Sequence, residues 1–167
     1  GAVDNGEVGG VTYDDFLAMF YPSGYTNDNT GNPIVVPPSH MMIRTIIESD
    51  QKSYQWFAPS GINRGAIDNA TAVGYVDVSG DFITASLPQS TRDVMAQNGK
   101  VNPLATLNGV GIVNYGNYTR AQAASSLDRI NVARLVAYLR RQLAILAQPY
   151  LFEPNDSTTR LAIKNAA

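Results

Sequence analysis

The sequence predicts an α/β fold, in which a mixed β-sheet is flanked by helices in a layered sandwich. Stretches with apolar residues at helical spacing alternate along the chain with short runs of β-branched and aromatic residues. The 167 residues are 44% hydrophobic and 16% charged, which supplies enough apolar material for one sizeable core. Because a free surface is normally richer in charge, we expect much of this one to contact other protein.

Composition excludes several classes of site. The chain has no cysteine and one histidine, which excludes disulfides, thiolate zinc sites, thiol nucleophiles and two-histidine metal sites. The formal net charge of -2 argues against a nucleic-acid partner. No apolar run approaches the ~18 residues that a membrane span needs. We therefore expect no cofactor, no metal, and no nucleic-acid or membrane partner.

The N-terminal part is expected to precede the main domain. Residues 1–10 are Gly-rich and acidic and lack an initial methionine, which predicts a flexible tail on a piece of a longer chain. A weak capping box predicts a short helix over residues 12–20. Turn-forming residues around Ile34–Val36 predict a long loop or an edge strand after it. Residues 11–38 are thus expected to form a short helix and a long loop, and residues 39–167 the core domain.

The first half of this core domain is expected to hold one helix and two strands. Methionine and isoleucine residues at helical spacing predict a helix that Ser39 caps and that ends near Asp50. Aromatic and β-branched runs bounded by Gly, Pro and Asn predict strands over residues 54–59 and 72–78.

The second half is expected to begin with a helix and a hairpin. The helix over residues 88–97 should end in a left-handed cap at the Asn-Gly pair that follows it. Two short strands within residues 103–116 should form a hairpin about Asn108-Gly109, because this dipeptide favours the tight turn that joins antiparallel strands.

The longest helix is predicted near the C-terminal end. Leucine, isoleucine and valine residues recur on one side over residues 121–148, and Pro149 should end the helix. A strand over residues 150–153 is then expected to lead into a last helix that is capped by Asp156 or Ser157.

Two features could carry chemistry, and each also has a structural interpretation. Glu153 and Asp156 could act as acid and base or bind magnesium. Alternatively, Asp156 satisfies free N–H groups at a helix start, and Glu153 forms a salt bridge with Arg134. The loop of residues 58–65 could cradle a phosphate, although it lacks the spacing of known phosphate loops, or its glycines permit a tight turn in which Arg64 holds the loop or reaches a partner. A metal- or phosphate-dependent hydrolase or transferase is therefore one alternative function.

Four stretches together resemble the contractile tail sheath proteins of myovirus-type bacteriophages. Their sequences are PPSHMMIRTIIESDQKSYQWFAPSGINRG, GVGIVNYGNYT, DRINVARL and FEPND. The resemblance covers about residues 36–165, and FEPND after the INVxRL pattern is its most specific part. The chain departs from the family pattern at Tyr115, which replaces a Trp, at Asn117-Tyr118, which replace Ala-Arg, and at Ala133, which replaces the first Arg of a pair.

The resemblance implies a structural function and not an enzymatic one. Family members form a helical homo-oligomer of sheath subunits around a tail tube protein, above a baseplate, and contract to drive the tube through the host envelope. The resemblance implies a place in the virion tail, with assembly in the host cytoplasm, and a sheath core that lacks both terminal regions of the family. Another virion tail or baseplate protein is a further alternative.

On this interpretation, charged side chains on the long helix and near its end are expected to contact other subunits or the tube. Arginines on a helix are usually a solvated flank, and a charged seam against an acidic protein surface is the sharper hypothesis. The expected contact residues are Arg64, Arg134, Arg140 and Arg141, with Glu153 and Asp156 as acidic partners.

Overall fold

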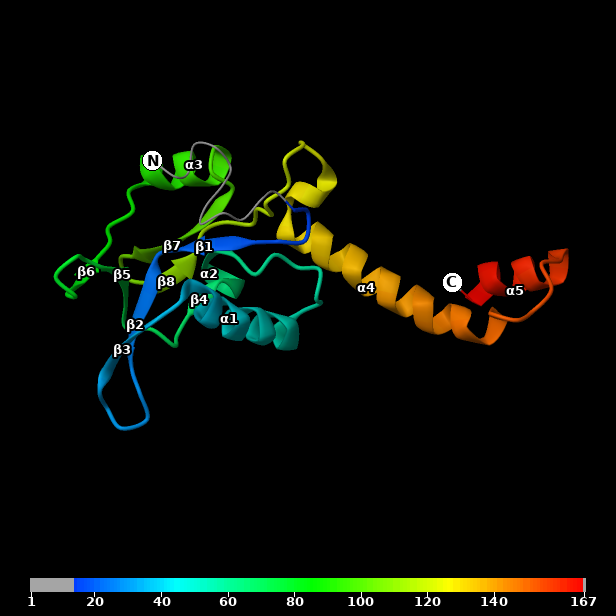
Figure 1. The fold of residues 1–167 in the computed structure, drawn as a ribbon, viewed down its shortest axis with the longest axis horizontal. Coiled ribbons are helices and arrows are strands. Elements are labelled where there is room, and N and C mark those ends of the chain that lie inside the picture. The colour runs from blue at the N-terminus through cyan, green and yellow to red at the C-terminus, as the bar shows by residue number, and fades with distance from the viewer. Residues whose placement is uncertain (1–13, 167) are drawn as a thin grey trace.

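The body of the protein is built on two four-stranded β-sheets (Figure 1). The computed structural model describes residues 14–166, so the tail expected over residues 1–10 lies outside the described residues. The first sheet is mixed, because its edge strand runs parallel to its neighbour while the other pairs are antiparallel. In spatial order its strands are β1 (Met19–Tyr21), β7 (Val101–Leu107), β8 (Gly111–Asn114) and β4 (Ala66–Ile67).

The second sheet is antiparallel throughout. In spatial order its strands are β3 (Pro33–Val36), β2 (Ser23–Asn27), β5 (Ala72–Val76) and β6 (Phe82–Thr84). The strand predicted at 72–78 is therefore confirmed as β5, and the edge strand proposed around Ile34–Val36 is confirmed as β3.

Helices flank the sheets, as predicted. They are α1 (Pro38–Lys52), α2 (Gly61–Arg64), α3 (Gln89–Gln97), α4 (Ile130–Ala147) and α5 (Ser157–Ala166), with short 3-10 turns at Ser126–Asp128 and Gln148–Tyr150. Figure 1 shows α1 and α3 on either side of the strands. The buried face of α1 carries Met41 and Met42, which pack with residues from both sheets. This core cluster consists of Val36, Met41, Met42, Ile67, Val73, Leu104 and Ile112.

The central hairpin follows from its local sequence. Five consecutive residues of β7, Val101–Ala105, are buried, as expected of a strand covered on both faces. The turn into β8 places Gly109 at φ 76, and the Val110 N–H donates to the Leu107 carbonyl at 3.1 Å. Glycine adopts a positive φ at no steric cost, which confirms the hairpin predicted about Asn108-Gly109.

Several predicted elements are wrong at the N-terminal side. The helix expected over residues 12–20 is replaced in its last part by β1, which pairs with β7, and the long loop after it contains the β2–β3 hairpin. No strand forms over residues 54–59, where three aromatic side chains stack on one another in a turn region instead. Strand β6 was not predicted.

Other corrections concern helix ends. The N-cap of α1 is Pro37 and not Ser39, and no side chain caps this end. After α3, Asn98 stays in the right-handed region, and the positive φ of 50 falls on Lys100. Helix α4 begins at Ile130 and not at residue 121. No strand forms over residues 150–153, because a 3-10 turn continues directly from the end of α4.

Helix α4 leaves the body and extends away from the sheets (Figure 1). Its first turn is anchored, since Ile130 and Ala133 are buried. From Ala137 onward most side chains are exposed. Among the described elements, α5 packs mainly against α4. We call the part from Ala137 to Ala166 the arm. It carries exposed apolar side chains that include Leu139, Leu143, Ile145, Leu151, Phe152 and Leu161.

Candidate docking surface on the arm

Two fully buried asparagines hold the segment from which α4 starts. The Asn102 side-chain amide donates to the Met19 carbonyl at 2.9 Å and to the Tyr118 carbonyl at 2.8 Å. Its Oδ1 accepts the Tyr118 N–H at 2.7 Å. One side chain of β7 thus joins β1 to the approach to α4.

Asn114 joins the loop before α2 to the segment after β8 in the same way. Its amide donates to the Pro59 carbonyl at 2.8 Å and to the Gly116 carbonyl at 3.0 Å, and its Oδ1 accepts the Gly116 N–H at 3.1 Å. Arg120, also fully buried, donates to the Gly99 carbonyl at 2.6 Å. These three residues could not be identified from the sequence, because asparagine is frequent along the chain and nothing local marks a buried arginine.

The base of the arm is fixed to α1 by an ion pair. The Arg134 Nη2 lies 2.6 Å from Oδ2 of Asp50, and both side chains are about three-quarters buried. Arg134 therefore pairs with Asp50, and the salt bridge considered between Arg134 and Glu153 is wrong. Removing the two charges from water costs free energy that offsets much of their attraction. The pair therefore contributes more to the orientation of α4 than to the stability of the fold.

Two of the other predicted arginines have contacts within the chain. Arg64 Nε donates to the Ala58 carbonyl at 3.2 Å, and its guanidinium lies 5.0 Å from the centre of the Phe57 ring. Arg64 therefore holds its own turn, which was one of its two expected roles. The guanidinium of Arg140 lies 5.2 Å from the centre of the Phe16 ring.

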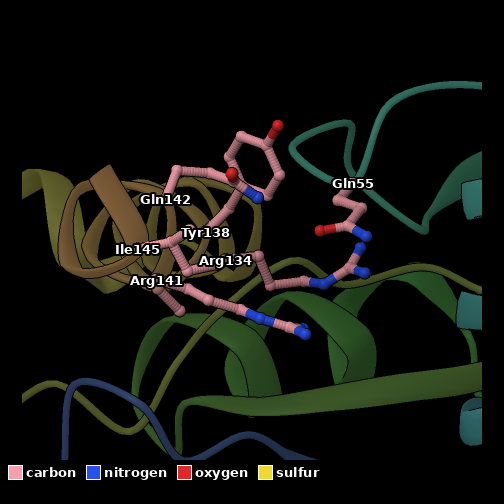
Figure 2. Close-up of a pocket in the computed structure, with 7 residues that line it drawn as sticks. Gln55, Arg134, Tyr138, Arg141, Gln142 and Ile145 are labelled. Atoms are coloured by element: carbon pink, nitrogen blue, oxygen red, sulfur yellow. The ribbon is translucent and has the colours of Figure 1, made fainter. Parts of the chain in front are cut away.

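Arg141 lies in an open pocket between the arm and the loop after α1. The pocket has a volume of about 450 Å³. Figure 2 shows the Arg134 and Arg141 side chains extended in the same direction from α4, with Gln55 beside the Arg134 guanidinium. Among the described residues, no acidic group forms an ion pair with Arg141. The pocket is lined by Gln55, Arg134, Ala137, Tyr138, Arg141, Gln142 and Ile145, and we call it the basic pocket.

Glu153 and Asp156 lie at the far end of the arm. Asp156 Oδ1 accepts the Thr159 N–H at 2.8 Å, which confirms Asp156 as the cap of α5. Glu153 is exposed and forms no ion pair with any residue of 14–166. Figure 1 places this end of the arm far from α2, so the two carboxylates and the 58–65 loop do not converge as the hydrolase alternative requires. Within residues 14–166 no group of three or more His, Cys, Asp or Glu side chains could hold a metal ion.

The cap of α5 should depend on pH. The hydrogen bond from the Thr159 backbone lowers the pKa of Asp156 below its usual value of 3.8. Because the pKa in the folded state is depressed, the stabilisation is present above 3.8 and is lost as pH falls through the lower, folded-state pKa. We expect an NMR titration to show the Thr159 amide resonance shifting with a midpoint below pH 3.8.

The matched variant for this prediction is Asp156→Asn. Its amide oxygen still accepts the Thr159 N–H, so α5 should persist at neutral pH while the acid shift of the Thr159 resonance disappears. An unchanged titration in Asp156→Asn would mean that another group causes the shift.

None of the helices in residues 14–166 combines the length and the apolar character that crossing a membrane requires.

Comparisons with known proteins connect the chain to one class of assembly. No model of a protein family matches the sequence. The tail sheath protein of Vibrio phage KVP40 is 37% identical over 117 residues, which are 70% of this chain and 16% of that protein. The tail sheath protein of Enterobacteria phage T4 is 30% identical over 140 residues, which are 84% of this chain and 19% of that protein.

Solved structures show the same fold. The helical sheath of the anti-feeding prophage in its contracted state matches with a TM-score of 0.74 and 20% identity, over 96% of this chain and 40% of that one. The contracted sheath complex of the PVC extracellular contractile injection system matches with a TM-score of 0.71 and 20% identity, over 93% of this chain and 39% of that one.

The chain spans about a fifth or less of the length of the curated relatives it matches. The resemblance inferred from the four sequence stretches is nevertheless confirmed, both by these relatives and by the shared fold. Sequence and fold together relate this chain to one segment of the contractile tail sheath proteins.

Proposed function

We propose that this protein is a structural subunit of a contractile phage tail sheath. Copies polymerise around the tail tube and then change their packing, and this change drives the tube through the host envelope. The observation that carries the proposal is the match to tail sheath proteins at 30% to 37% identity over 70% to 84% of the chain. These relatives are longer than this chain, so the proposal is tested on the gene product in which this sequence occurs.

The architecture is suited to a subunit that moves as a body. Asn102 joins β1 and β7 to the segment before α4, and the Arg134–Asp50 pair joins α4 to α1, so a force on the arm is transmitted to the body. Contraction then needs two packings of the same subunits that differ in interface free energy, with no nucleotide consumed. Exposed apolar side chains on the arm supply interface area, since an isolated helix does not keep such a face in water.

We infer the partners from this role. They are other sheath subunits in a helical homo-oligomer, the tail tube protein and the baseplate, and neither nucleic acid nor membrane is among them. The protein then resides in the tail of the virion, after assembly in the host cytoplasm. The proposed contact residues remain Arg64, Arg134, Arg140, Arg141, Glu153 and Asp156. Arg141 and Glu153 are favoured among them, because the other four have contacts within the chain.

We propose a structural and not an enzymatic role. The hydrolase or transferase alternative requires Glu153, Asp156 and the 58–65 loop to converge, and the length of α4 separates the two carboxylates from the loop. A tail tube protein would favour a β-barrel over a helix of 18 residues.

Assembly of the gene product tests the proposal. Negative-stain electron microscopy of the full-length gene product is expected to show hollow striated tubes, and the 167-residue chain at the same concentration is expected to show single particles. Dispersed particles of the full-length product at every concentration and salt condition would argue against a sheath. Binding of a divalent metal or a nucleotide by the 167-residue chain would instead favour the enzymatic alternative.

A further inference from the structure

The basic pocket offers hydrogen-bond donors that no described residue uses. Arg134 engages Asp50 through one nitrogen, while its Nη1 is buried and has no partner within residues 14–166. Arg141 is exposed and forms no ion pair with the described residues. Asp50 offsets one of the two guanidinium charges, so the pocket keeps one uncompensated positive charge.

The chemistry of the pocket selects a carboxylate on an apolar segment. A guanidinium is a planar fork of donors that matches the two oxygens of a carboxylate. The Gln55 amide adds a polar group at the edge, and the walls next to the arginines are formed by Ala137, Tyr138 and Ile145. These walls suit an apolar or aromatic side chain that accompanies the carboxylate into the pocket.

A group with this chemistry is exposed on the same chain, at the end of the arm. Leu151 is 69% exposed and Phe152 is 99% exposed. Glu153, the next residue, is exposed and unpaired among the described residues. We call these three residues the corner. An exposed aromatic side chain beside a carboxylate is the type of anchor that dominates protein interfaces.

The corner does not occupy the basic pocket of its own chain, since residues 151–153 are not among those that line it. The pocket extends along α4 from Arg134 to Ile145, and the corner lies beyond the end of this helix. Glu153 and Arg141 of the same chain form no ion pair. Both groups are therefore available to a second copy.

We propose that the corner of one copy docks in the basic pocket of the next copy, where the Glu153 carboxylate pairs with Arg141. The inference rests on the proposed function, because it names a contact between sheath subunits. The two surfaces differ, so the contact is heterologous, and its repetition produces a ring or an open helix and not a closed dimer. A helical sheath is an assembly of this kind.

A charge exchange in the full-length gene product tests the contact. Arg141→Glu and Glu153→Arg are each expected to reduce the pelletable polymer about tenfold or more, because each places like charges together in the interface. The double variant Arg141→Glu/Glu153→Arg restores opposite charges and is expected to recover most of the polymer. Lys164→Glu makes the same change of charge on an exposed part of α5 and should assemble like the unmodified protein.

The outcomes separate this contact from the proposed function. If the unmodified protein forms tubes and both single variants do so equally well, the contact is wrong and the sheath function stands. If both single variants fail and the double variant also fails, the pairing of Arg141 with Glu153 is wrong. If the unmodified protein never polymerises, the proposed function fails. Circular dichroism on every variant, and the milder Arg141→Gln, distinguish a lost contact from a lost fold.

A second measurement distinguishes a protein carboxylate from a small anion. Trp56, the only tryptophan of the chain, has its ring centre 5.4 Å from that of Tyr138, which lines the basic pocket. Its fluorescence therefore reports on the pocket. Titration of the 167-residue chain with inorganic phosphate is expected to leave this fluorescence unchanged. A saturable change that Arg141→Gln abolishes would identify the pocket as a small-anion site and overturn the docking proposal.

Discussion

Replacement of Asn102 by alanine is expected to lower the free energy of unfolding by about 3 kcal/mol, because three hydrogen bonds at a fully buried position are lost together. The variant leaves the carbonyls of Met19 and Tyr118 and the N–H of Tyr118 without the partner that they have now. Water cannot replace this partner without opening the junction between β1, β7 and the segment that leads to α4. We therefore also expect the arm to become mobile relative to the body.

Urea unfolding followed by circular dichroism measures this effect. Asn165→Ala is the matched control, since Asn165 is exposed near the end of α5 and its replacement should change stability by less than about 0.5 kcal/mol. A similar unfolding midpoint for the two variants would contradict the role assigned to Asn102.

Replacement of Gly74 by alanine is the second large effect, expected to lower stability by roughly 3 kcal/mol. A Cβ at this position would overlap the carbonyl oxygen of Ile83 and would lie 2.8 Å from the Phe82 ring and 2.9 Å from the Ile83 carbonyl carbon. The Ile83 backbone belongs to β6, which is paired with β5 at this point. Relief of the overlap therefore requires the two strands to separate.

Gly31→Ala is the control for this variant. Gly31 has φ 88 in the β2–β3 turn, and a Cβ there would meet nothing within 4 Å. Its replacement introduces backbone strain of about 1–2 kcal/mol without a steric overlap. Thermal unfolding should show Gly74→Ala to be clearly the less stable variant, and equal losses would mean that β6 moves away freely.

Local chemistry made some elements predictable from the sequence. The hairpin about Asn108-Gly109 depends on a glycine at positive φ, and the cap of α5 depends on a carboxylate three residues before the N–H that it accepts. The strand β5 contains the β-branched and aromatic residues that are typical of strands. In each case the cause lies within a few residues of the effect.

Long-range contacts explain why other elements were predicted wrongly from the sequence. Strand β1 forms because Met19 and its neighbours pair with β7 from Val101 onward, and helical spacing in the local sequence gives no sign of this pairing. Residues 54–59 have aromatic residues typical of a strand, but their rings stack on one another, and Trp56 makes a tilted contact with Tyr138 of α4. Residues 150–153 were also predicted as a strand from their apolar side chains, but Leu151 and Phe152 are exposed at the end of the arm and belong to neither sheet.

The candidate site was predictable in part. The charges of Arg141 and Glu153 are visible in the sequence, and an arginine-rich helix suggests a seam against another protein. The partners that shape the basic pocket are not visible, because Asp50 and Gln55 come from a distant part of the chain and only the fold brings them to α4. Asp50 in particular forms an ion pair with Arg134 and leaves Arg141 without one among the described residues.

Cryo-electron microscopy of the assembled full-length gene product tests the central claim, that this chain is part of a sheath subunit, most directly. The account predicts a hollow helical tube in which residues 14–166 fit each repeating unit as one body, with density from a neighbouring subunit against the exposed face of the arm. Tubes whose wall does not contain this fold, or an arm that faces only solvent in the assembled particle, would contradict it.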